Sequence, residues 1–162
     1  MLEQSILYDF RLAGRRVRLW KRAGESYEHV LMKALGFAMY AREFPGLEVE
    51  PEVGLRYTPD LLARRDEAEH RGARFPFWGE CGQTTVRKIG WLLKHADVGR
   101  LVLFKMVRSP HALSRELRAD IESRYRDEGR LRVINFSSSV VSLAADRKID
   151  DVPESWYTEI VV

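Results

Sequence analysis

The sequence predicts an α/β protein, in which a mixed central sheet is flanked by helices and preceded by an N-terminal β-hairpin. Between residues 75 and 136, apolar strand-like segments alternate with segments of helical periodicity, in the order strand, helix, strand, helix, strand. This order is typical of a partly parallel sheet with helices packed on it. Because 162 residues are enough for one hydrophobic core, we expect a single domain over residues 1–162.

Residues 5–20 have the pattern of the hairpin. Apolar residues alternate along 6–12 and along 17–19, and Ala13-Gly14 between them can form the turn. The segment 11–22 carries six positive side chains and no acid: Arg11, Arg15, Arg16, Arg18, Lys21 and Arg22. Such a patch can bind the phosphates of a nucleic acid. The alternative is a solvated edge hairpin, whose arginines prevent pairing with other strands.

A long helix is predicted between Glu25 and Glu43, because apolar residues recur there at steps of three and four. The segment 44–46 (Phe-Pro-Gly) ends it. Glu28 lies seven residues before Leu35 and so falls on the apolar stripe. A carboxylate on a core-facing stripe is unfavourable unless something compensates its charge. Either Glu28 stabilises the positive end of the helix dipole, or it faces a cation.

Two further acids, Asp60 and Glu80, each lie in a predicted strand. If these strands pair across the charged tip at 64–72, both carboxylates lie at the same end of the sheet. Two ionised carboxylates about 4 Å apart repel each other by about 4 kcal/mol at an effective dielectric constant near 20. Such a pair needs a raised pKa, a cationic side chain or a divalent cation. The pattern predicts a metal site, and the alternative is two unrelated surface acids at strand ends.

A second helix is predicted over residues 84–97, with a threonine as its N-cap. Arg87 and Lys88 lie in its first turn, next to the strand end that carries Glu80. Positive side chains at a helix N-terminus oppose the helix dipole, and a nearby acid or phosphate would compensate for this. The position of these two side chains therefore favours a functional role for this end of the sheet.

The second half of the chain supplies the remaining elements. The apolar run 99–106 suits a buried central strand. A helix with Ser109-Pro110 at its start is predicted to extend to Gly129, and a strand follows over 130–136. We also expect a short strand at 140–143 and an edge strand over 156–162.

Three segments together resemble a known family. Residues 24–29 (Gly-Glu-Ser-Tyr-Glu-His) open the first helix, 57–62 are Tyr-Thr-Pro-Asp-Leu-Leu, and 78–83 are Trp-Gly-Glu-Cys-Gly-Gln. In this order they resemble the YaeQ-like family within the PD-(D/E)XK nuclease superfamily, over about residues 5–105. The resemblance implies a restriction-endonuclease-like fold and a metal-dependent, nuclease-like protein that hydrolyses phosphodiester bonds of DNA or RNA.

The resemblance also implies roles for individual residues. Asp60, Glu80 and the backbone carbonyl of Cys81 would hold Mg²⁺ or Mn²⁺, and Glu28 would bind a second ion directly or through water. The sequence departs from the superfamily at Gly82, where the general motif has a lysine.

Other side chains are expected to compensate for the missing lysine. Lys88 would reach back over Gly82, and Gln83 would help to position a water molecule. The side chains expected to hold nucleic acid are Arg11, Arg15, Arg16, Arg18 and Arg87. The alternative is a catalytically inactive protein on the same fold, which binds nucleic acid or another partner without turnover.

Composition excludes several other classes of protein. No apolar run approaches the roughly 18 residues of a membrane span, and the N-terminus has no signal-peptide character, so we expect a cytoplasmic protein. The one cysteine, Cys81, excludes an internal disulfide and a cysteine-rich zinc module, and we expect its thiol to be buried. A net charge of +3 permits an acidic partner without requiring one.

Overall fold

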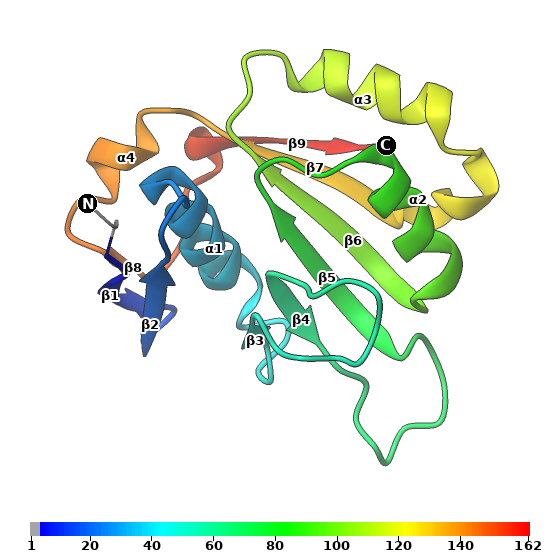
Figure 1. Cartoon of the computed structure of the whole chain (residues 1–162), viewed down its shortest axis with the longest axis horizontal. Coiled ribbons are helices and arrows are strands. Elements are labelled where there is room, and N and C mark those ends of the chain that lie inside the picture. Colours follow the sequence, from blue (N-terminus) through cyan, green and yellow to red (C-terminus); the bar gives the residue numbers. More distant parts are fainter. Residues whose placement is uncertain (1–3) are drawn as a thin grey trace.

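The computed structural model describes residues 4–162 and contains two β-sheets with a helix between them (Figure 1). The larger sheet has the strand order β3-β4-β5-β6-β7-β9, and the smaller one has the order β2-β1-β8. The strands are β1 (Ile6–Leu12), β2 (Arg15–Lys21), β3 (Glu48–Val49), β4 (Leu61–Ala63), β5 (Phe75–Cys81), β6 (Val98–Lys105), β7 (Leu131–Phe136), β8 (Lys148–Ile149) and β9 (Tyr157–Val161). The helices are α1 (Tyr27–Tyr40), α2 (Val86–His95), α3 (Pro110–Asp120) and α4 (Val140–Leu143), with 3-10 turns at Ser123–Tyr125, Asp127–Gly129 and Glu154–Trp156.

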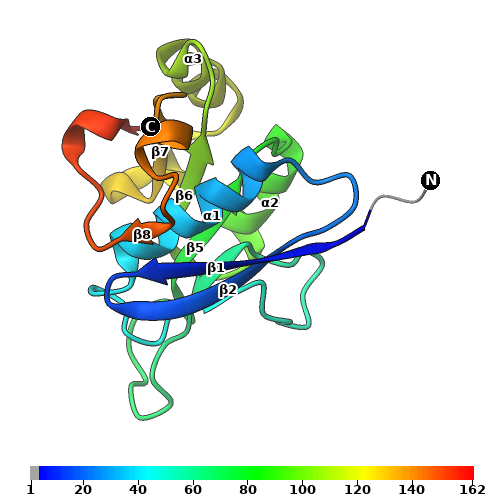
Figure 2. The same cartoon turned by 90° about the vertical axis from the view of Figure 1, so that its left-hand side faces the viewer.

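The predicted N-terminal hairpin is present. β1 and β2 pair antiparallel from Ile6↔Lys21 to Leu12↔Arg15. Ala13 and Gly14, which form the turn, both have positive φ (49° and 78°), as the tight turns that suit twisted hairpins require. β8 adds to the other edge of β1 in parallel. This short pairing completes the smaller sheet, which Figure 2 shows in front of α1.

Helix α1 packs between the two sheets. Its N-cap is Ser26, whose hydroxyl accepts a hydrogen bond from the backbone N–H of His29. Gly36 allows a close approach to the larger sheet, because an added Cβ there would lie 2.8 Å from Phe104 and 2.9 Å from Leu61. Both faces of α1 are therefore covered, one by each sheet.

The centre of the larger sheet is parallel. β5 pairs in parallel with β6, and β6 with β7, while β4 and β9 run antiparallel on either side. Helices α2 and α3 connect the parallel strands and cover the face opposite α1 (Figure 1). The predicted strand-helix-strand-helix-strand unit is thus confirmed, as are the α/β class and the mixed sheet flanked by helices. Within residues 4–162, the helices are too short or too polar for a membrane span.

Two predicted elements differ from the structure. The expected strand at 140–143 is the helix α4, and it follows a turn in which the Ser137 hydroxyl accepts a hydrogen bond from the backbone N–H of Ser139. Serine side chains that bond the nearby backbone favour such local turns over a strand. The helix expected to reach Gly129 ends at Asp120, because Ile121 has an extended backbone and the chain continues in 3-10 turns.

Candidate functional site

Asp60 and Glu80 lie opposite each other where β4 begins and β5 ends. The register pairs Leu61 with Gly79, and the Asp60 N–H donates to the Gly79 carbonyl oxygen at 3.1 Å, so the next cross-strand pair is Asp60 with Glu80. The Asp60 Oδ2 accepts a hydrogen bond of 2.8 Å from the backbone N–H of Cys81. The expected pairing of the two strands is therefore confirmed, and it brings both acids to one end of the sheet.

Both carboxyl groups are largely buried. Burial raises the pKa of Asp60 above its ordinary value, against the opposing effects of the Cys81 N–H and the nearby His29. Burial also raises the pKa of Glu80, and the charge of Asp60 adds to this effect. The charge of Asp60 thus disfavours the ionised form of Glu80, whereas burial is the main cause of the raised pKa of Asp60. A cation beside them would favour ionisation of both.

Lys88 supplies one such cation. Its Nζ donates to Glu80 Oε2 at 2.9 Å, while the indole N–H of Trp78 donates to Glu80 Oε1 at 2.8 Å. The Lys88 ammonium also lies 5.2 Å from the centre of the Tyr57 ring, within range of a cation–π interaction. The threonine cap of α2 is Thr85, which accepts from the backbone N–H of Lys88 at 3.1 Å. Lys88 therefore reaches the acidic pair from the first turn of α2.

His29 of α1 occupies the space beside Gly82. Gly82 has a φ of +75°, and an added Cβ there would lie 3.2 Å from His29 Cδ2. The ring Nε2 is 3.1 Å from the Cys81 carbonyl oxygen and 3.9 Å from Asp60 Oδ2. The other ring nitrogen, Nδ1, contacts the carboxylate of Glu25. An imidazole thus lies where a side chain at residue 82 would otherwise begin.

The prediction that Glu28 lies on a buried stripe is wrong, because Glu28 is exposed. Helix α1 is buried on almost all sides from Val30 to Ala38, so its apolar residues do not single out the face that Glu28 shares. In the first turn, His29 is the residue that turns towards the strand ends. Glu25, His29 and Lys33 follow one another at steps of four residues. This spacing in the sequence could have identified the helix face that turns towards the strand ends.

Two buried lysines also adjoin the acids. Lys33, whose side chain is 3% exposed, donates to Glu25 Oε2 at 2.6 Å and also pairs with Glu50. Burial alone would lower the pKa of Lys33, but the two carboxylates outweigh this and raise it. Lys105 donates to the Gly82 carbonyl, and burial lowers its pKa. Sequence reasoning missed both, although each is a lysine within an apolar segment.

The ligand atoms near Asp60 and Glu80 limit how a metal ion could be bound. Within residues 4–162, no three His, Cys, Asp or Glu side chains converge closely enough to hold one. Asp60 Oδ1 accepts no hydrogen bond from this part of the chain, so one oxygen of the buried carboxylate is available. The Cys81 thiol is buried in the core on the α1 side, and burial raises its pKa well above the ordinary value. Any ion here would combine side-chain and backbone oxygens with water.

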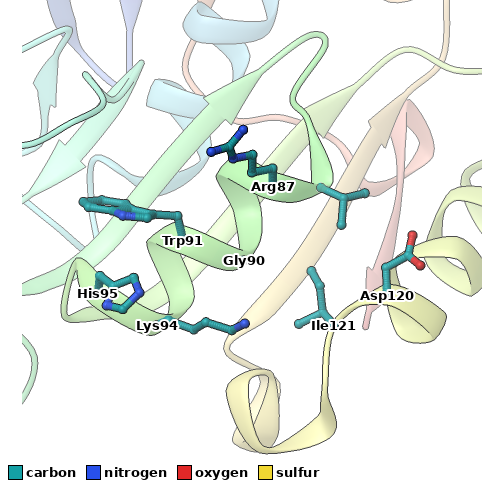
Figure 3. A pocket seen from close by; sticks show the side chains of 8 residues that line it. Arg87, Gly90, Trp91, Lys94, His95, Asp120 and Ile121 are labelled. Carbon is teal, nitrogen blue, oxygen red and sulfur yellow. The ribbon is translucent and has the colours of Figure 1, made fainter.

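Gln83 and Arg87 are both exposed. Gln83 makes no hydrogen bond within the described residues, and Arg87 lies on the outer side of α2. Figure 3 shows Arg87 at the edge of a hollow of about 330 Å³ between α2 and the end of α3. Trp91 and Lys94 line the same hollow, and neither of the two acids does. Arg87 therefore borders a hollow that no residue of the basic hairpin lines.

The outer face of the smaller sheet carries half of the predicted basic patch, namely Arg11, Arg16 and Arg18. Its register places Arg16, Arg11 and Lys148 in one row across the three strands. Arg18, opposite Asp9, forms the next row, and Asp9 accepts hydrogen bonds from both Arg16 and Arg18. Trp20 is 46% exposed on the same face. We define the outer face as the set Arg11, Arg16, Arg18, Trp20 and Lys148.

Arg15 has a different role from the other hairpin arginines. Its guanidinium donates to the Pro45 carbonyl at 2.9 Å and lies over the Phe37 ring. These contacts tie the hairpin turn to the C-terminal end of α1.

Two neighbouring hollows lead from the hairpin to His29. One, of about 240 Å³, is lined by Arg18, Trp20, Arg22 and the Lys33–Glu50 pair, with Leu19 and Val49. The other, of about 360 Å³, is lined by Arg22, Ala23, Gly24, Glu25 and His29. Arg22 belongs to both, so the two hollows extend from the outer face to Glu25 and His29.

Comparison with known proteins identifies solved structures with a similar fold. Neither a protein-family model nor the sequence of a curated protein matches this chain. The YaeQ protein from Xanthomonas axonopodis pv. citri has a similar structure, with a TM-score of 0.58 and 18% identity, over 98% of this chain and 95% of that one. The YaeQ protein from Pseudomonas syringae superposes with a TM-score of 0.54 and 14% identity, over 96% and 92% of the two chains. The chain therefore has the fold of these YaeQ proteins.

Proposed function

We propose that this chain is a YaeQ-like member of the PD-(D/E)XK superfamily and a metal-dependent, nuclease-like protein that hydrolyses phosphodiester bonds of nucleic acids. The observation that carries the proposal is the buried, cross-strand pair of Asp60 and Glu80, with Lys88 bonded to one of them. The shared fold and the order of the three motifs support it.

The residues that would hold Mg²⁺ or Mn²⁺ are Asp60, Glu80 and the backbone carbonyl of Cys81. They fit a hard cation, because all three offer oxygen donors and Asp60 Oδ1 has no hydrogen-bond donor among the described residues. Such an ion, when bound, lowers the pKa of water and neutralises charge on a phosphate. Three ligands suffice for Mg²⁺, which usually keeps several waters.

The protein's own cations and polar groups would complete the site. Lys88 lies with its ammonium 2.9 Å from Glu80, where it can stabilise negative charge that develops on a phosphate. In this way Lys88 would take the role of the lysine that is missing at position 82. Gln83, exposed between β5 and α2, would help to orient the attacking water.

The outer face would hold the nucleic acid. Arg11, Arg16 and Arg18 offer cations to phosphates, which position a chain without reading its sequence. Trp20 beside them offers a ring on which a base can stack. The two hollows that share Arg22 would lead a bound strand towards the acids.

A second candidate is a binding protein without turnover on the same fold. Both oxygens of Glu80 already accept hydrogen bonds, one from Trp78 and one from Lys88, which favours an acidic pair neutralised by the protein itself. In this case Lys88 would replace the metal ion rather than assist it.

Calorimetric titration of Mn²⁺ and Mg²⁺ at low salt would test the proposal, with wild type, Asp60→Ala and the control Glu116→Ala compared. Glu116 is an exposed acid on α3. We expect saturable binding to wild type and control that is lost in Asp60→Ala, together with cleavage of oligonucleotides. Absence of binding, even with an oligonucleotide present, would refute the metal site. Binding of metal and oligonucleotide without cleavage would favour the second candidate.

A further inference from the structure

The position of His29 offers a structural reason for the glycine at position 82. The superfamily places a lysine there, and this chain has a glycine whose missing side chain leaves room for an imidazole. A Cβ at Gly82 would lie 3.2 Å from His29 Cδ2 and 3.8 Å from His29 Nε2. Since 3.2 Å is closer than ordinary van der Waals contact, a Cβ there would require the ring to shift by a few tenths of an ångström. The glycine therefore suits both the position of His29 and its own φ of +75°.

His29 Nε2 lies close to two of the proposed oxygen donors, and its contact with the Cys81 carbonyl is a hydrogen bond in the metal-free protein. It lies 3.1 Å from the Cys81 carbonyl oxygen and 3.9 Å from Asp60 Oδ2. Two ligands at right angles on bonds of about 2.1 Å lie about 3.0 Å apart, and two opposite ligands about 4.2 Å apart. The first distance matches neighbouring ligands of one ion, and the second lies between the two limits. Asp60 Oδ2 is held by the Cys81 N–H, so an ion bound by all three residues requires the Asp60 carboxylate to move.

Glu25 holds the ring in this orientation. It contacts His29 Nδ1, while its Oε2 accepts from Lys33 at 2.6 Å and its Oε1 accepts from the Arg22 N–H at 3.0 Å. A carboxylate on the second ring nitrogen is the usual partner of a histidine that binds metal through the first. The carboxylate is itself fixed on both oxygens, so the ring has a rigid support.

We propose, on the basis of the proposed function, that His29 is a metal ligand of this site, together with Asp60 and the Cys81 carbonyl. An imidazole nitrogen favours divalent transition ions, whereas a set of oxygens alone suits Mg²⁺. The site therefore prefers Mn²⁺, Co²⁺ or Ni²⁺ over Mg²⁺. In this proposal α1 contributes half-buried His29 to the site, and Glu28 stays exposed.

Metal binding to the full-length, metal-free protein tests this inference. Mn²⁺ and Mg²⁺ affinities would be measured by calorimetry, and pulsed electron paramagnetic resonance of bound Mn²⁺ would detect a coordinated nitrogen. We expect nitrogen coupling in wild type and in the control His95→Ala, an exposed histidine on α2. His29→Ala should lose the coupling and bind Mn²⁺ about 10–100-fold more weakly, on the scale of changes around metal-binding histidines.

Two further variants separate ligation from support of the fold. His29→Gln keeps a polar side chain near the Cys81 carbonyl but removes the imidazole, so it should also lose the nitrogen coupling. Glu25→Gln should keep the coupling and weaken Mn²⁺ binding about tenfold. Circular dichroism would verify that each variant is folded.

The outcomes distinguish this inference from the proposed function. If wild type binds Mn²⁺ without nitrogen coupling, and His29→Ala binds it equally well, His29 is not a ligand while the acidic metal site remains. If wild type binds neither ion, or Asp60→Ala binds as well as wild type, both the inference and the proposed function are wrong.

Discussion

Lys88 Nζ lies 2.9 Å from Glu80 Oε2, so a residue of helix α2 provides the cation for an acid of strand β5. The Glu80 side chain is 4% exposed and the Lys88 side chain 22%, which leaves the pair largely shielded from solvent. The contact gives Lys88 a defined place, although its helix position would by itself be slightly unfavourable. Whether the pair serves catalysis or only stability can be measured directly.

Lys88→Ala should reduce the rate of phosphodiester cleavage by at least tenfold while changing nucleic-acid affinity little. The reason is that the ammonium would act on charge developed during reaction rather than on the bound ground state. Single-turnover cleavage rates at saturating protein would measure this, with Lys94→Ala as control, because Lys94 lies exposed on the same helix. Equal rates for wild type and Lys88→Ala would exclude the catalytic role.

Asp60→Asn should stabilise the protein at neutral pH in metal-free buffer. Burial raises the pKa of Asp60 in the folded state, so the folded protein disfavours the ionised carboxylate. Stability due to this group is then fully present below the unfolded-state pKa of about 4, and is lost as pH rises through the folded-state value. Asparagine carries no charge at any of these pH values, and its oxygen can still accept from the Cys81 N–H.

Thermal unfolding of wild type and Asp60→Asn between pH 3 and pH 8, with a chelator present, would check this dependence. The higher melting temperature of the variant should diminish as the pH falls and disappear near pH 4. A variant that melts below wild type at pH 7 would contradict the prediction.

Two glycine-to-alanine substitutions in helices should have opposite effects on stability. At Gly36, the new Cβ would lie 2.8 Å from Phe104, and overpacking of this kind costs about 1–3 kcal/mol. At Gly90, nothing lies within 4 Å of the new Cβ, so the helix gains up to about 1 kcal/mol from the better propensity of alanine. Chemical denaturation of both variants would measure the difference, and equal effects would show that α1 can move away from the sheet.

The outer face should bind single-stranded nucleic acid through both stacking and charge. Trp20→Ala should weaken binding by about 1–3 kcal/mol without changing its dependence on salt, because stacking involves no counterions. Arg16→Ala should instead reduce the slope of log affinity against log salt by about one, since one phosphate contact is lost. Fluorescence anisotropy at several salt concentrations would separate the two effects.

A matched control for the outer face is Arg124→Ala, an exposed arginine in the 3-10 turn after α3. It should change neither the affinity nor the salt slope. If all three variants bind like wild type, nucleic acid is not held by the smaller sheet.

The regular elements near the site were largely predictable from local patterns. Alternation and turn residues identified the hairpin, and the unit from β5 to β7 follows from apolar runs separated by helical periodicity. Lys88 was predicted correctly to lie near Glu80, since a strand and the helix that follows it fix the distance between them.

Features that depend on distant parts of the chain were not predictable in this way. Helix α1 is buried on almost every side, so periodicity could not show that His29 rather than Glu28 faces the strands. The two-residue strand β8 has no pattern of its own and exists through its pairing with Arg11 and Leu12. Lys105 enters the site only because β6 lies beside β5.

The pairing of β1 with β8 also affects the order in which the protein can fold during synthesis. The hairpin and α1 emerge before the strands that cover the other side of α1, because β5 and β6 end only at Cys81 and Lys105. The edge of β1 stays open until Lys148 and Ile149 have been made. Since contacts between distant residues form slowly, the nascent chain must keep an apolar helix and an open strand edge from aggregating until β8 has emerged.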